Sequence, residues 1–116
     1  MEGFEIEHVG QNDIDILYVK GYLDAHTAPD LENMLQSLTD KNRFKIVVNF
    51  EELNYISSAG LGVFMGYIEL IRANKGDIKL SNMSPKIFRV FDLLGFPALY
   101  QIFDGETEAK AKFTEA

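Results

Sequence analysis

The most informative absences in this sequence are cysteine and long apolar runs. With no cysteine, the chain has no disulfide, no thiolate metal ligand and no cysteine nucleophile. No apolar run approaches the roughly 20 residues that a membrane-spanning helix needs. Residues 1–5 carry neither the basic nor the apolar segment of a signal peptide. We therefore expect a protein that does not insert into membranes and that acts in the cytoplasm.

Positive charge is also scarce. The sequence has 11 lysines and arginines against 18 aspartates and glutamates, which gives a net charge of −7. A surface of this sign repels nucleic-acid phosphates and anionic lipids, so neither is expected as a direct partner. It would suit a protein partner with a basic docking face, although many acidic proteins are merely soluble.

Catalytic and cofactor-binding motifs are missing as well. The two histidines, His8 and His26, do not have the H-x-x-x-H spacing of a metal site. No serine lies in a G-x-S-x-G nucleophile motif, and the glycines of residues 60–62 are too few for a phosphate-binding loop. We therefore expect no catalytic residue, no metal, no cofactor and no enzymatic activity.

Hydrophobic periodicity predicts strands that alternate with helices in one domain over residues 1–116, with a core at about 4–104 and a tail at about 105–116. The expected strands are 4–8, 14–21, about 45–50, 78–81 and 99–103, and the expected helices are about 27–40, about 58–74 (with Gly76 as its C-terminal cap) and 84–95. Residues 51–54 read as a connection, and residues 106–116 as a terminal helix or a frayed end. The order β-β-α-β-α-β-α-β predicts an α/β fold, a mixed β-sheet flanked by helices.

The best candidate site is the turn at residues 54–62, which reads N-Y-I-S-S-A-G-L-G. Ser57 and Ser58 lie where a strand-side turn becomes a helix, so a serine hydroxyl there can accept a hydrogen bond from the first free helix amides. The same hydroxyl would lie at the surface, where another protein can reach it. Asp24, in the loop before the first helix, is expected either to cap that helix or to stay exposed beside the serine turn.

Three segments resemble the anti-sigma factor antagonists, which are bacterial STAS domains. Residues 54–62 resemble that family's Asp-Ser-Ser/Thr/Ala-Gly-Leu-Gly signature, together with the apolar or aromatic pair before it. Residues 21–24, G-Y-L-D, resemble its G-E-[LI]-D motif, and residues 88–96 resemble its R-[LV]-F-D-x-x-G-[LF] segment. The three occur in the family's order and cover nearly the whole chain.

This resemblance implies a STAS fold and a switch protein that binds an anti-sigma factor, which in this family is often also a serine kinase. The kinase phosphorylates the serine that corresponds to Ser58, phosphorylation releases the antagonist, and a PP2C-type phosphatase reverses the modification. The residues that the resemblance assigns to partner binding are Asp24, Thr27, Ser57, Ser58, Ala59 and Gly60.

Two positions depart from the family pattern. Ser57 stands where the family has the aspartate before the phosphoserine, and Tyr22 stands where it has the glutamate of G-E-[LI]-D. Ser57 is therefore a second candidate acceptor. Three alternatives stay open: that the serines only cap the helix, that the chain is a non-switching STAS adaptor subunit of a signalling or transport complex, and that it is a nucleotide- or small-ligand-binding module or a weak enzyme.

Overall fold

The protein, seen in a computed structural model that describes residues 3–114, is built on a six-stranded sheet with the order β1-β2-β3-β5-β6, in which β4 pairs with β2. The strands are β1 (Phe4–Gln11), β2 (Ile14–Leu23), β3 (Lys45–Asn49), β4 (Leu53–Ile56), β5 (Asp77–Ser81) and β6 (Ile102–Phe103). β1 is antiparallel to β2, and the other pairings are parallel. The expected mixed sheet and its N-terminal hairpin are therefore confirmed.

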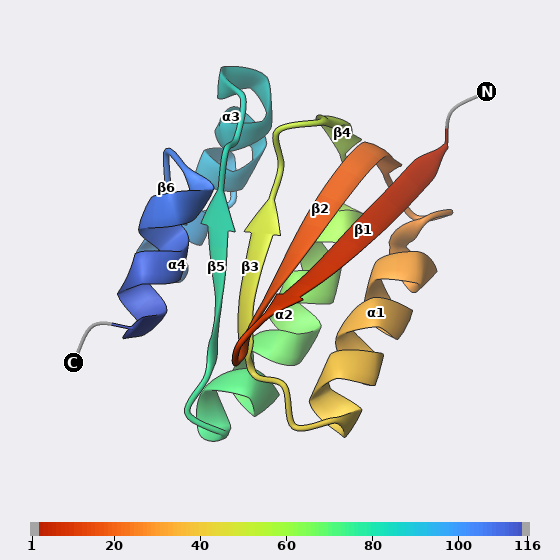
Figure 1. Cartoon of the computed structure of the whole chain (residues 1–116). Coiled ribbons are helices and arrows are strands. Elements are labelled where there is room, and N and C mark those ends of the chain that lie inside the picture. The colour runs from red at the N-terminus through yellow and green to blue at the C-terminus, as the bar shows by residue number, and fades with distance from the viewer. Residues whose placement is uncertain (1–2, 115–116) are drawn as a thin grey trace.

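Helices cover both faces of this sheet (Figure 1). They are α1 (Ala28–Asp40), α2 (Ser58–Ala73), α3 (Pro85–Leu93), the short 3-10 helix η1 (Phe96–Ala98) and α4 (Glu106–Thr114). α1 and α2 pack side by side on one face, which we call the inner face, while α4 lies on the outer face over β3 and β5. None of the helices within residues 3–114 is long and apolar enough to cross a membrane.

The main core lies between the inner face and the helices. Ile46 and Val48 of β3 are fully buried and point into it, as do the leucines at helical spacing along α1. Parallel strands that are covered on both faces are typically continuous apolar runs, and β3 follows this rule because Val47, between those two residues, is buried on the outer face.

α4 closes the outer face with one small residue and several polar contacts. Ala109 is fully buried against Ile14, Ile16 and Val47. Asn49 Nδ2 donates a hydrogen bond of 3.1 Å to Glu106 Oε1 at the start of the helix. Burial would raise the pKa of Glu106, but hydrogen bonds from Tyr18, Asn49 and Lys110 outweigh it and hold that pKa below its usual value. The segment expected as helix or frayed end is thus helical to Thr114, and residues 115–116 lie outside the described part.

The structure corrects two strand predictions. Residues 53–56, which were expected as the end of a connection and the start of the serine turn, form β4 beside the end of β2. The pattern was weak because β4 has only four residues and the middle two, Asn54 and Tyr55, are exposed. The last strand is confined to Ile102–Phe103, because residues 96–98 form η1 and Leu99 follows that turn with helical backbone angles.

The prediction that Gly76 caps α2 is also wrong in its mechanism. The residue in the left-handed conformation after this helix is Lys75, with φ 67°. Gly76 is needed for space instead, because a Cβ at this position would collide with the backbone carbonyl of Phe44. The glycine therefore lets the end of α2 pass close to the start of β3.

Candidate functional site

The site forms where the carboxyl ends of β2 and β4 lie side by side. Leu23 pairs with Ile56 in the parallel register of these strands, so Asp24 and Ser57 are the residues that follow directly on each strand. The backbone N–H of Ser57 donates a hydrogen bond of 2.9 Å to the carbonyl oxygen of Leu23. The loop before α1 and the turn before α2 are joined at this point.

Asp24 organises its own loop. Its Oδ1 accepts hydrogen bonds from the backbone N–H groups of His26 (2.9 Å) and Thr27 (3.1 Å), which is the Asx-turn geometry typical of aspartate in loops. Thr27 Oγ1 accepts from the backbone N–H of Asp24 (3.0 Å) and donates to the carbonyl oxygen of Tyr22 (2.8 Å). Asp24 therefore fixes the path of the loop, and Thr27, the residue before α1, ties that loop back to the end of β2.

The two serines have different roles at the start of α2. Ser57 is the N-cap residue, and its Oγ accepts a hydrogen bond of 3.4 Å from the backbone N–H of Gly60. Ser58 is the first residue of the helix and is exposed. Within residues 3–114, no side-chain hydrogen bond involves the Ser58 hydroxyl. The capping function that the sequence predicts for a serine at this turn thus falls to Ser57.

The electrostatic setting of Ser58 favours negative charge. The free amides of a helix N-terminus carry a partial positive charge, and the first turn of α2 contains no acidic residue that would offset it. Within the described residues, no histidine or carboxylate forms a hydrogen bond with the Ser58 hydroxyl. The start of α2 is therefore an environment that stabilises an anionic group more than a cationic one.

Gly60 lies beneath this surface. It is buried, and a Cβ built on it would lie 2.7 Å from Leu23 Cγ and 3.1 Å from the Leu23 carbonyl oxygen. It therefore lets α2 approach the end of β2, and the exposed part of the candidate face is left to Ser58 and Ala59, with the half-buried Asp24, Thr27 and Ser57 beside them.

Replacing Gly60 with alanine should lower the free energy of unfolding by about 1–3 kcal/mol, because the fully buried Leu23 has no room to move aside. Gly62→Ala is the matched control, since a Cβ there meets nothing within 4 Å and alanine has the higher helix propensity. It should raise stability by up to about 1 kcal/mol. Urea unfolding measures both, and equal effects of the two substitutions would contradict the close approach of α2.

Two exposed tyrosines adjoin the site, although sequence reasoning did not include them among the partner-binding residues. Tyr22 and Tyr55 are paired in the register of β2 and β4, and their ring centroids are 6.3 Å apart. Recognition of β4 was the missing step, since the two rings are brought together only by the pairing of that strand with β2. The signal available in the sequence was the run L-N-Y-I, in which two aliphatic residues flank a polar and an aromatic one. In the structure the two aliphatic ends are buried and the middle residues are exposed.

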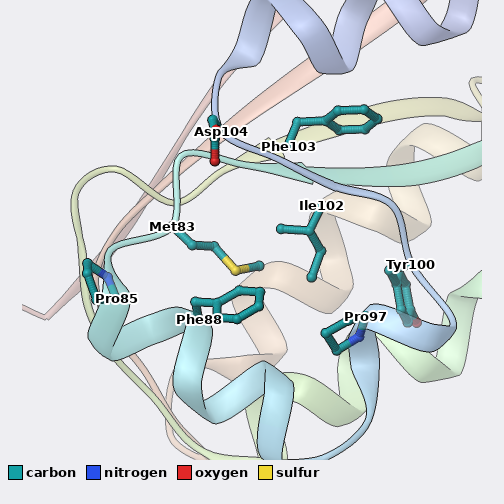
Figure 2. Close-up of a pocket in the computed structure, with 8 residues that line it drawn as sticks. All are labelled: Met83, Pro85, Phe88, Pro97, Tyr100, Ile102, Phe103 and Asp104. Atoms are coloured by element: carbon teal, nitrogen blue, oxygen red, sulfur yellow. The ribbon is translucent and has the colours of Figure 1, made fainter.

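A separate pocket of about 580 Å³ lies between α3, η1 and β6 (Figure 2). In the close-up, Met83, Phe88 and Ile102 point toward one another, and Pro97 and Tyr100 border the other side. None of its lining residues comes from β2, β4 or α2. If this protein binds a small ligand, as one of the open alternatives holds, this pocket is where such binding should be tested, and it is independent of the serine turn.

Comparison with known proteins gives a consistent result. A STAS domain family model matches residues 5–109. An anti-sigma-B factor antagonist of Listeria monocytogenes is 32% identical over 104 residues, which is 90% of each chain. An anti-sigma factor antagonist from Mycobacterium paratuberculosis superposes with a TM-score of 0.89 at 17% identity, covering 97% of this chain and 96% of that one. The phosphorylated form of the Bacillus cell fate determinant SpoIIAA superposes with a TM-score of 0.73 at 24% identity, covering 96% and 99%.

Proposed function

The chain belongs to the STAS domain family, and we propose that it is an anti-sigma factor antagonist whose binding to an anti-sigma factor is switched off by phosphorylation of Ser58. The partner is an anti-sigma factor that also acts as a serine kinase, a PP2C-type phosphatase restores the binding form, and the exchange takes place in the cytoplasm. The binding face consists of Asp24, Thr27, Ser57, Ser58 and Ala59, with Gly60 packed beneath it.

The observation that supports this proposal most strongly is the accessibility of the Ser58 hydroxyl. It is exposed, it has no side-chain hydrogen bond within residues 3–114, and it lies on the first residue of α2 beside the loop that Asp24 fixes. A kinase can reach such a hydroxyl without unfolding any part of the protein. Ser57 is the weaker candidate acceptor, because its Oγ already caps the helix.

Phosphorylation at this position would act on binding more than on folding. The phosphate adds about −1.5 to −2 charges and three acceptor oxygens. In the free protein, the N-terminus of α2 tolerates this charge and gains about 0.3–1 kcal/mol from it. In a packed interface, the same group must be desolvated and accommodated, and a penalty of a few kcal/mol lowers affinity by more than about a hundredfold. SpoIIAA, which shares the fold, has a phosphorylated form, and this supports the proposal that the fold itself accepts the modification.

The function is tested by reconstitution with purified components. The unphosphorylated protein should bind an anti-sigma factor from the same genome and should release the sigma factor from a preformed complex with it. A folded protein that binds none of that genome's anti-sigma factors would overturn the proposal. Binding that persists without release of any sigma factor would favour the non-switching adaptor instead.

A further inference from the structure

Tyr22 and Tyr55 form an aromatic pair on a part of the sheet that no helix covers. Their strand neighbours Leu23 and Ile56 are buried on the inner face, so the alternation of β2 and β4 turns the tyrosines to the outer face. α4 packs on β3, β5 and β6 and covers the first half of β2, where Ala109 contacts Ile14 and Ile16. In Figure 1, no helix of the described residues lies over the far end of β2, where Tyr22 pairs with Tyr55 of β4. The rings are tilted by 35° to each other, and the residues Tyr22 and Tyr55 are 45% and 43% exposed.

The pair is continuous with the serine site. The carbonyl oxygen of Tyr22 accepts the hydrogen bond from Thr27 Oγ1 that holds the Asp24 loop. Tyr55 is three residues before Ser58, with the buried Ile56 and the capping Ser57 between them. A protein that covers Ser58 and Asp24 would therefore extend over the tyrosine rings.

The surface around the pair is acidic. Lys20, two residues before Tyr22 on the same face, is held by Glu7, whose Oε1 accepts a hydrogen bond of 3.0 Å from Lys20 Nζ. That bond raises the pKa of Lys20, and the charges of Glu52 and Glu5 raise it further, so three carboxylates act on this one ammonium group. Net negative charge beside exposed aromatic rings attracts a cationic group that can pair with the carboxylates and also lie on the rings.

Cross-strand tyrosines also stabilise a sheet by themselves, and that structural role accounts for their contact with each other. It does not require that both tyrosines stay exposed at the edge of the proposed binding face. Tyrosine and arginine are enriched among the residues that dominate protein–protein binding energy, and arginine stacks its planar guanidinium on aromatic rings while donating to carboxylates.

We propose that the Tyr22–Tyr55 pair is a second contact for the anti-sigma factor, occupied by an arginine side chain of that partner. The guanidinium lies on the tyrosine rings and faces the acidic surface formed by Glu5 and Glu7 of β1 and by Glu52, which precedes β4. This contact rests on the proposed function. It adds to that function the side of the serine turn on which the partner binds, which is the side of the tyrosine pair. It also adds a chemical requirement to the partner, namely a cationic residue opposite the sheet face.

The test is a titration of the anti-sigma factor that binds the wild-type chain against variants at the two tyrosines. Tyr22→Ala and Tyr55→Ala should each weaken binding roughly 3- to 30-fold. Tyr22→Leu and Tyr55→Leu should weaken it similarly, because leucine keeps apolar area but lacks the negative aromatic face. Tyr22→Phe and Tyr55→Phe should bind within about twofold of wild type, since a phenyl ring keeps that face.

Leu93→Ala is the matched surface control, because Leu93 is 77% exposed on α3, outside the proposed face, and should leave affinity unchanged. Urea unfolding checks that every variant is folded. Alanine variants that bind like wild type would overturn the contact, and leucine variants that bind like wild type would overturn the cationic partner. A tyrosine effect on self-association of the chain, without one on anti-sigma binding, would assign the pair to a second copy and overturn the inference. Wild-type protein that binds no anti-sigma factor would instead overturn the proposed function, and the second contact with it.

Discussion

Ser58→Asp should weaken binding to the anti-sigma factor by more than about a hundredfold while leaving the fold intact or slightly more stable. The carboxylate replaces a free, exposed hydroxyl on the first residue of α2. At a helix N-terminus the added charge should raise the free energy of unfolding by about 0.3–1 kcal/mol. In the interface the same charge must be desolvated without a partner, at a cost of a few kcal/mol. Affinity and stability are therefore expected to move in opposite directions.

Two variants control this experiment. Ser58→Ala removes the hydroxyl without adding charge and should keep wild-type affinity. Ser57→Asp adds the same charge one residue earlier, at the N-cap, where aspartate replaces serine as a capping acceptor. It should keep measurable binding. Calorimetric titration gives the affinities and urea unfolding gives the stabilities. Binding by Ser58→Asp within threefold of wild type would contradict a charge-controlled interface at this position.

Phe91→Ala should lower the free energy of unfolding by about 3–5 kcal/mol. This is a large fraction of the total free energy of unfolding of a domain of this size. Phe91 of α3 is fully buried in a chain of aromatic contacts. Its ring centroid is 5.2 Å from that of Phe50 and 5.2 Å from that of Phe96, both in edge-to-face geometry. Removing the ring leaves a cavity and breaks three aromatic pairs, these two and a tilted one with Phe64 at 6.5 Å. Such pairs contribute about 0.5–1.5 kcal/mol each beyond burial.

Phe88→Ala is the control for Phe91, since Phe88 lies one turn earlier on the same helix and is 38% exposed beside the pocket. It should cost about 1 kcal/mol or less, because a partly exposed ring gives up less burial. Urea unfolding of the two variants in parallel measures the difference. Similar losses for both would show that α3 does not insert Phe91 into the core as the structure has it.

The fold was predictable from the sequence where local signals and burial agree. The apolar run of β3 is confirmed, and so is the start of α3, where Ser84 Oγ accepts from the backbone N–H of Ile87 and Pro85 is the first helical residue. The helix that begins at Ser58 is confirmed as well. In each case one short segment contains both the hydrophobic pattern and the capping residue, so no distant contact is needed to recognise it.

The remaining features depend on contacts between distant segments. β4 has two exposed residues in its middle and is a strand only because it pairs with β2. Gly76 is required by Phe44, which is 32 positions earlier in the chain, and no local pattern indicates that collision. The same limit applies to the site. The pairing of β2 with β4 and the hydrogen bond from Ser57 to Leu23 bring the loops of Asp24 and Ser58 together, and both are contacts between distant segments.

The most direct test of the central claim is to map phosphate on the chain while it is bound to the anti-sigma factor kinase in the presence of ATP. Trypsin cleavage after Lys45 and Arg72 gives a fragment in which Ser57 and Ser58 are the only serine or threonine residues, so fragmentation between them assigns the site by mass spectrometry. We predict phosphate on Ser58 and dissociation of the phosphorylated chain from the kinase. A complex that persists in ATP with no phosphate on either serine would contradict the switch and would identify the protein as a constitutive adaptor.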